Sequence, residues 1–320
     1  MRWPLWKRDG AAGSPAGTFT LACVVDRHPR FHVELILWAL CARAHLPESR
    51  FDPVVYFVDA APPDLVEWLR RQRIEVRSTP TLIAASPHCN KIAPFAERHD
   101  GAVTLVADAD LFFVEDFSGL LRSARFRAPP NNHCNPPPAV FRTVLAAAGV
   151  GDYRPGLALY RGAGGIRETH VNNISAGLVA APPSRSRELA AAWLKWARWV
   201  VEHRHLLDRW AVHVDQIAFA LAMEDMKEDV ELLPAQTNAV LHLLAEVETV
   251  YGFHLTTGHI PRFPERFNAD RTLSADGVAG GVAAAIGRLN DCIAEAVGVI
   301  AALPSTRDHM EMFLNPGWRR

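Results

Sequence analysis

The sequence predicts an α/β fold built on a doubly wound, mostly parallel sheet that is flanked by helices. In the first third of the chain, short runs of β-branched and aromatic residues alternate with stretches whose apolar residues share one helical face. This alternation is typical of parallel strands joined by crossover helices. Three of the runs end beside an aspartate, so Asp26, Asp59 and Asp108 occupy the edge where such sheets bind ligands.

The elements follow one another in a regular order. Residues 19–25 form the first expected strand, and the apolar positions from Val33 to Ala44 share one face of the helix that follows it. The same alternation continues up to Asp108. We expect further strands at 54–58, 74–76 and 103–106, and helices at 63–72 and 91–98.

The second half of the chain mixes strands and helices without a clear repeat. Residues 128–165 are rich in Pro, Asn and Gly around a helix-like piece at 139–148, so we expect two mobile loops around one helix. Beyond these loops, the pattern predicts a strand at 174–181 and helices at 187–203 and 214–223.

A helix near the C-terminus carries an apolar stripe on one face. We expect it to dock on the core, with pairing to another subunit or contact with a membrane surface as the alternatives. The most apolar stretch, 277–303, is interrupted by charged residues, so no transmembrane segment is predicted. The stripe consists of Ile286, Leu289, Ile293, Val297 and Ile300.

Composition and short motifs exclude several classes of protein. The chain has 34 Lys and Arg against 35 Asp and Glu, a formal charge of −1, so we expect no nucleic-acid partner. Its five cysteines are widely spaced and never form a Cys-x-x-Cys pair, which favours a reducing compartment, the cytoplasm. The glycine motifs of dinucleotide-binding and P-loop proteins do not occur at the expected places.

The strongest local signal is a pair of carboxylates, Asp108 and Asp110, directly after the apolar run 103–106. Hard oxygen ligands at this spacing suit Mg²⁺ or Mn²⁺, and such an ion can bridge to the oxygens of a diphosphate. A solvated acidic turn is the alternative. The buried strand before the pair and its place at the ligand edge of the sheet favour the metal site.

Six motifs follow one another along residues 19–267, and they are Asn90-Lys91-Ile92, Asp108-Ala-Asp110, Ser175-Ala-Gly177, Asp215-Gln216, Leu233-Pro-Ala-Gln-Thr-Asn238 and Phe253-His254-Leu-Thr-Thr-Gly258-His-Ile-Pro261. In this order they resemble the GT-A-fold glycosyltransferases, in particular the glycogenin-like and bacterial lipopolysaccharide galactosyltransferase-like group called family 8. The resemblance implies transfer of a sugar from a nucleotide-diphosphate donor, a UDP-sugar above all. The acceptor would be a hydroxyl of a glycan, a lipid or a small molecule.

The resemblance also implies metal ligands and donor contacts. Asp108, Asp110 and His254 match the family's ligands for Mn²⁺ or Mg²⁺, and a structural histidine is the alternative for His254. Lys91 would place a point charge on phosphate, with an exposed helical lysine as the alternative. Asp26 would face the base or ribose of the donor, with a loop-capping aspartate as the alternative.

The resemblance also implies roles for residues of the later motifs. Ser175 and Gly177 would let the backbone approach donor or acceptor closely, and Gly258 would belong to the donor site. Asp215 and Gln216 would be the catalytic pair, in which Asp215 hydrogen-bonds the acceptor or serves as general base. A helix cap is the alternative for Asp215.

Two positions depart from the family's pattern. Ser175 stands where the family usually has Asn, which bears on the contact with the donor sugar. Arg262 follows Pro261 where the family commonly has Lys before Pro-Trp. We treat Arg262 as a candidate to replace that positive charge at phosphate.

A repeated tripeptide offers one further interpretation. His88-Cys89-Asn90 and His133-Cys134-Asn135 together supply the two His and two Cys of a tetrahedral zinc site. Adjacent His and Cys are unlike the spacing of common zinc knuckles, so two ordinary loops are the interpretation we favour.

The resemblance leads to a prediction of the function and of the parts of the chain. We predict a cytoplasmic, metal-dependent glycosyltransferase, with a phosphohydrolase that uses Asp108 as nucleophile and a non-catalytic nucleotide-sugar-binding protein as alternatives. In such phosphohydrolases Thr or Val usually follows Asp-x-Asp, whereas Leu111 follows here. The parts are a flexible leader at 1–17, a nucleotide-sugar-binding half at 18–125, a loop-rich lid at 126–170, an acceptor-side half at 171–270 and a C-terminal helical extension at 271–320.

Overall fold

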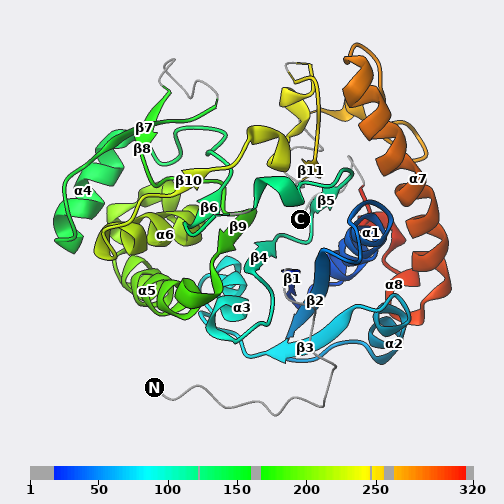
Figure 1. Cartoon of the computed structure of the whole chain (residues 1–320), viewed down its shortest axis with the longest axis horizontal. Helices are drawn as coiled ribbons and strands as arrows, with labels where there is room; N and C mark the ends of the chain where they lie inside the picture. Colours follow the sequence, from blue (N-terminus) through cyan, green and yellow to red (C-terminus); the bar gives the residue numbers. More distant parts are fainter. Residues whose placement is uncertain (1–17, 122, 160–166, 246, 256–262, 315–320) are drawn as a thin grey trace.

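A seven-stranded sheet forms the centre of the protein. The computed structural model describes residues 18–121, 123–159, 167–245, 247–255 and 263–314. The strands of the sheet are β1 (Phe19–Val25), β2 (Phe51–Val58), β3 (Glu75–Thr79), β4 (Val103–Ala107), β6 (Arg127–Ala128), β9 (Leu178–Ala181) and β10 (Glu231–Leu232). Their order is β10-β6-β9-β4-β1-β2-β3 (Figure 1). Only β9 runs antiparallel to its neighbours, so the predicted mostly parallel α/β sheet is confirmed.

Helices cover both faces of this sheet. On one face α1 (Pro29–His45) packs against α7 (Gly280–Ala302), and on the other α5 (Pro183–Glu202) packs against α6 (Val214–Asp225). The shorter helices are α2 (Pro63–Arg71), α3 (Ala93–Ala96), α4 (Pro138–Ala148) and α8 (Pro304–Arg307).

Side chains of the central strands alternate between two apolar cores. Leu21 and Cys23 of β1 belong to the core under α1 and α7, whereas Ala22 of β1 belongs to the core under α5 and α6. In β4, Leu105 belongs to the core under α1 and α7, and Val106 belongs to the core under α5 and α6. A strand that is buried on both faces needs an unbroken apolar run, which is why these two strands are the clearest in the sequence.

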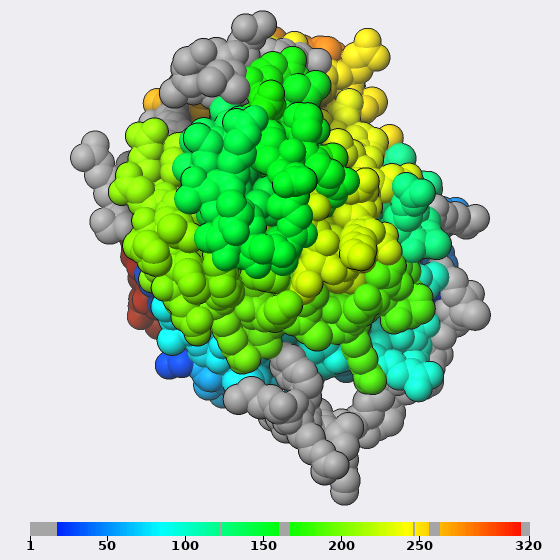
Figure 2. Space-filling view, turned by 90° about the vertical axis from the view of Figure 1, so that its left-hand side faces the viewer, coloured from blue at the N-terminus to red at the C-terminus, as the bar shows by residue number. Residues whose placement is uncertain are grey.

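Two small antiparallel pairs complete the strands. β5 (Leu111–Phe113) follows β4 and pairs with β11 (Gly252–His254), which sets His254 opposite Leu111. β7 (Pro155–Leu157) pairs with β8 (Glu168–His170) beside α4. Figure 2 shows α4 and this second pair gathered as a green surface on one side of the molecule, next to α6.

Two elements differ from the sequence-based expectation. The helix expected at 91–98 is a 3₁₀ helix, Pro87–Ile92, followed by the single turn of α3, because Glu97 already adopts an extended backbone. The strand expected at 174–181 begins only at Leu178. The segment before it is held in a loop, where the Ser175 N–H donates to Pro129 O at 3.0 Å.

The C-terminal helix docks on the core, as expected. α7 lies along α1, and its stripe residues Ile286, Leu289, Ile293 and Ile300 are buried. Among the described residues, no helix combines the length and the hydropathy needed to cross a bilayer. The division of the chain into five parts stays a prediction, and the leader at 1–17 lies outside the described residues.

The docking of α7 predicts a clear stability difference between its two faces. Leu289→Ala removes a fully buried side chain and should lower the free energy of unfolding by about 2–5 kcal/mol, since it leaves a cavity between α7 and α1. Asp291→Ala on the exposed face is the control and should change it by less than about 0.5 kcal/mol. Urea denaturation measures both variants, and equal effects would contradict the docking.

Candidate functional site

Polar side chains gather where β1 and β4 end. The chain adds β2 and then β3 on one side of β1, and it adds β4 on the other side of β1. The ends of β1 and β4 therefore flank the point at which the winding of the sheet reverses direction. Ligands of open α/β sheets bind at this point. A cavity of about 370 Å³ opens here. Its lining includes Asp26, Arg30, Lys91, Asp108, Asp110, Ser175, Gly177, Asp215, Gln216 and His254.

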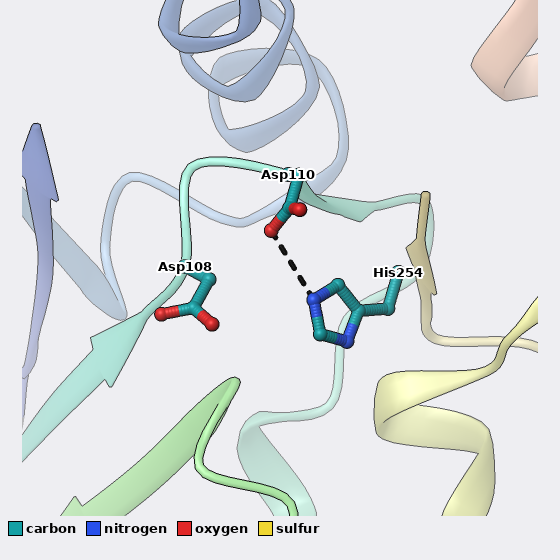
Figure 3. Close-up of side chains that lie close together, drawn as sticks. All are labelled: Asp108, Asp110 and His254. Atoms are coloured by element: carbon teal, nitrogen blue, oxygen red, sulfur yellow. Dashed lines mark hydrogen bonds and ion pairs between the residues drawn. The ribbon is translucent and has the colours of Figure 1, made fainter. Parts of the chain in front are cut away.

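Three of these residues form a cluster of possible metal ligands. One ligand atom from each of Asp108, Asp110 and His254 lies within 4.8 Å of the other two, and these are the only such group of three or more among the described residues. Asp108 follows β4, Asp110 precedes β5, and His254 ends β11 (Figure 3). His254 Nε2 lies 3.2 Å from Asp110 Oδ1. Pairing of β5 with β11 therefore brings together residues from two distant parts of the chain.

Gly177 leaves room for this histidine. A Cβ atom at position 177 would lie 2.8 Å from His254 Cε1, which is closer than real Cβ atoms pack, and 3.1 Å from Asn238 Oδ1, which is a tight contact. The Gly177 carbonyl also accepts a hydrogen bond from the Asp108 N–H at 2.9 Å. Gly177 thus holds Asp108 through its backbone carbonyl and leaves room for His254 because it has no side chain.

The charges of the cluster favour an ionised carboxylate and a protonated imidazole when no cation is bound. Burial raises the pKa of Asp110, but the attraction of His254 and a hydrogen bond from it outweigh this effect and hold the pKa well below its usual range. Burial lowers the pKa of His254, but Asp110 and then Asp108 outweigh it and the pKa is raised. The protonated imidazole and the ionised carboxylate therefore stabilise each other when no cation is bound.

Lys91 is buried rather than exposed, so the surface-lysine alternative is wrong. Its ammonium donates to Asp108 Oδ1 at 2.7 Å, to Asp215 Oδ2 at 3.3 Å and to Ala176 O at 3.1 Å. These three contacts match its three N–H donors. Burial lowers the pKa of Lys91, but the two carboxylates outweigh this and raise it above its ordinary value.

Asp215 lies in the first turn of α6 with its side chain in the cavity. No side-chain hydrogen bond caps the start of α6, so the helix-cap alternative is wrong. Burial raises the pKa of Asp215, but Lys91, His88 and His213 outweigh it, and the pKa lies below its ordinary value. The neighbouring Gln216 also lines the cavity, where its Oε1 lies 3.4 Å from Asn131 Nδ2.

The remaining predicted residues divide into two groups. Asp26 and Ser175 lie in the cavity lining, and Ser175 Oγ accepts a hydrogen bond from Asn238 Nδ2 at 2.9 Å. Gly258 and Arg262 lie outside the described residues, so their predicted roles stay predictions.

Sequence reasoning missed two charged residues of the site, Arg30 and Glu34 of α1. Both side chains are buried, and Arg30 lines the cavity. The available signal was a pair of opposite charges four residues apart at the start of a helix whose middle is apolar.

The zinc interpretation of the repeated tripeptide is wrong. His88, Cys89, His133 and Cys134 are all described, yet they do not appear together in any group of possible metal ligands. Cys89 and Cys134 are separately buried, and His133 stacks on His242 with ring centroids 5.4 Å apart.

Comparison with known proteins identifies the fold. No model of a known protein family matches this chain, and no curated protein matches it. Among solved structures, the galactosyltransferase LgtC in complex with donor and acceptor sugar analogues matches with a TM-score of 0.52 and 11% identity, over 86% of this chain and 95% of that chain. An active-site mutant of LgtC matches with a TM-score of 0.55 and 12% identity, over 88% and 95% of the respective chains. The likeness shows the GT-A fold, which confirms the predicted resemblance at the level of the fold.

The close approach at Gly177 yields a steric prediction. Gly177→Ala should displace the His254 ring and lower the free energy of unfolding by about 1–3 kcal/mol, since the new methyl group overpacks a buried site. Gly119→Ala is the matched control, because nothing lies within 4 Å of its added Cβ atom. Urea denaturation measures the stability of both variants. Equal stability of the two would show that position 177 has more room than the structure indicates.

The Asp110–His254 pair predicts a pH dependence for the metal-free protein. The folded pKa of His254 is raised, so its stabilising contribution is complete below the unfolded value of about 6.5 and is lost as the pH rises through the folded pKa. Urea denaturation of wild type between about pH 5.5 and 9 should show this loss. In His254→Gln that part of the slope should disappear. Identical pH profiles for the two proteins would contradict the pairing.

Proposed function

We propose that this protein is a metal-dependent glycosyltransferase that moves a sugar from a nucleotide-diphosphate donor, a UDP-sugar above all, to a hydroxyl acceptor. The observation that carries the proposal is the cluster of Asp108, Asp110 and His254 at the winding reversal of a GT-A fold. A cluster of this composition in a cavity of this fold favours binding of a diphosphate through a divalent cation.

The residues fit a divalent cation of the Mn²⁺ or Mg²⁺ kind. Two carboxylates supply hard oxygen atoms, and the imidazole favours Mn²⁺ within this pair of ions. His254 Nδ1 is buried without a hydrogen-bond partner among the described residues, so the ring is oriented by Nε2, the atom that faces Asp110. When bound, the ion would stabilise the negative charge that develops on the departing nucleoside diphosphate.

Three residues of the cavity lining are our candidates for contacts with the two substrates. Asp26 at the end of β1 is our candidate contact for the base or ribose, and Asp215 with Gln216 is our candidate contact for the acceptor. Because Lys91 keeps the pKa of Asp215 low, this carboxylate would be a weak base at neutral pH. We therefore favour a role in which Asp215 accepts a hydrogen bond from the acceptor hydroxyl and orients it.

The wider setting of the reaction is also a proposal. We infer a cytoplasmic enzyme from the five free cysteines and their spacing. The acceptor that we propose is a hydroxyl group of a glycan, a lipid or a small molecule. The segment 126–170, which carries α4, is our candidate for the lid that orders over the donor.

Thermal shift in the presence of metal and nucleotide tests the proposal. UDP with Mn²⁺ should raise the melting temperature of wild type, and at 100 times its Kd a ligand stabilises the folded state by about 2.7 kcal/mol. UDP without Mn²⁺ should have little effect. Asp110→Asn should abolish the metal-dependent shift, because it removes a charged ligand and keeps the shape of the side chain. Asp291→Asn on the exposed face of α7 is the matched control and should retain it.

The products of donor turnover separate the proposal from its alternatives. Incubation of wild type with Mn²⁺ and a panel of UDP-, GDP- and CDP-sugars should release nucleoside diphosphate from one donor. Release of inorganic phosphate from a parallel panel of phosphate monoesters would instead identify a phosphohydrolase. Binding of a donor without any product, in the presence of a broad acceptor panel, would identify a nucleotide-sugar-binding protein.

A further inference from the structure

A buried ion pair of α1 faces the metal-ligand cluster. Arg30, in the first turn of α1, is only 3% exposed and nevertheless lines the cavity. Its Nε donates to Glu34 Oε1 at 2.7 Å, and its Nη2 lies 3.8 Å from Asp110 Oδ2. One side of the guanidinium is therefore anchored in α1, while the other lies beside a candidate metal ligand.

Burial of this pair costs free energy, because polar and charged groups lose their hydration in the interior. The neighbours of Arg30 and Glu34 on the buried face of α1 are largely apolar, and replacement of a buried ion pair by well-packed apolar residues is often neutral or stabilising. Burial raises the pKa of Glu34 to about 8, against the opposing attraction of Arg30. A buried arginine next to a cavity, hydrogen-bonded to a carboxyl group whose pKa is raised, therefore indicates a role other than stability.

Lys91, a second buried cation of the cavity, already uses its N–H donors for contacts within the protein. Its three N–H donors meet Asp108, Asp215 and the Ala176 carbonyl. A donor diphosphate brings further negative charge into a cavity that is already lined by four aspartates. A divalent ion offsets the negative charge of the intact diphosphate but not the further charge that develops on it when its bond to the sugar breaks. A second cation near the metal-ligand cluster would stabilise that further charge, and Arg30 lies there.

The distances place Arg30 within reach of such a diphosphate. Arg30 Nη2 lies 3.8 Å from Asp110 Oδ2, and both residues line the same cavity. A diphosphate held through an ion at Asp110 would therefore lie in the neighbourhood of this guanidinium. The planar fork of arginine suits two oxygens of a phosphate, which a single ammonium does not.

We propose that Arg30, anchored by Glu34, binds the diphosphate of the donor directly. This inference rests on the proposed function, because it requires a diphosphate at the metal-ligand cluster. Arg30 would hold the negative charge of the nucleoside diphosphate when its bond to the sugar breaks, and Glu34 would act as a positioning residue through Arg30.

Calorimetric binding measurements with three probes test this role. The probes are Mn²⁺ alone, Mn²⁺ with pyrophosphate and Mn²⁺ with UDP. Arg30→Met should weaken binding of pyrophosphate and UDP at least tenfold and leave the affinity for Mn²⁺ alone unchanged. Arg30→Lys should restore part of the loss, since it keeps the charge without the fork. Glu34→Gln should weaken UDP binding less than Arg30→Met does.

Two controls keep the result interpretable. The double variant Arg30→Met with Glu34→Met removes both charges, leaves no unpaired buried carboxylate and should show the same loss of diphosphate binding in a folded protein. Arg185→Met removes an ion-paired arginine at the start of α5 and should bind all three probes as wild type does.

The outcomes separate the inference from the function on which it rests. Unchanged UDP binding in Arg30→Met and in the double variant would overturn the inference alone. A parallel loss of affinity for Mn²⁺ alone would also overturn it, because Arg30 would then act only through Asp110. Wild type that binds neither pyrophosphate nor UDP with Mn²⁺ would overturn the proposed function itself.

Discussion

The site depends on one buried ammonium group. Lys91 lies between the carboxylates of Asp108 and Asp215 and donates to the Ala176 carbonyl, so it joins the end of β4, the start of α6 and the loop before β9. Without a cation at this position, the buried carboxylate of Asp215 and the partly buried carboxylate of Asp108 would repel each other and lose solvation without compensation. The 3₁₀ helix Pro87–Ile92 carries Lys91 to this place, and α5 and α6 pack against that helix.

Around this ammonium, the fold assembles a cluster of ligands from distant parts of the sequence. The winding reversal between β1 and β4 opens the cavity, and the small β5–β11 pair delivers His254 to Asp110. The absence of a side chain at Gly177 allows that approach. Arg30 closes the cluster on the side of α1. Charges of both signs therefore alternate through the cavity, which is the arrangement that we expect for binding a polyanion with a divalent cation.

Much of this arrangement could be predicted from sequence because it arises from strong local patterns. The unbroken apolar runs of β1 and β4 predict buried parallel strands, and Asp108 and Asp110 stand out directly after such a run. Other features depend on tertiary contacts. The burial of Lys91 cannot be recognised from the sequence pattern, because its partners Asp108 and Asp215 lie in other segments. The spacing of Arg30 and Glu34 is visible in the sequence, but the position of Arg30 beside Asp110 is not, because these two residues lie far apart along the chain. The short α3 and the late start of β9 reflect loops that are held by long-range hydrogen bonds, such as that from Ser175 N–H to Pro129 O.

The most direct test of the account is the location of a bound manganese ion. Crystals of wild type grown with Mn²⁺ and UDP, with diffraction recorded at the manganese absorption edge, would reveal the ion by its anomalous signal. The account predicts one strong peak within bonding distance, roughly 2.0–2.3 Å, of Asp110 and His254 and close to Asp108. A peak elsewhere, or none in crystals that contain bound UDP, would contradict the central claim that these three side chains form a metal site.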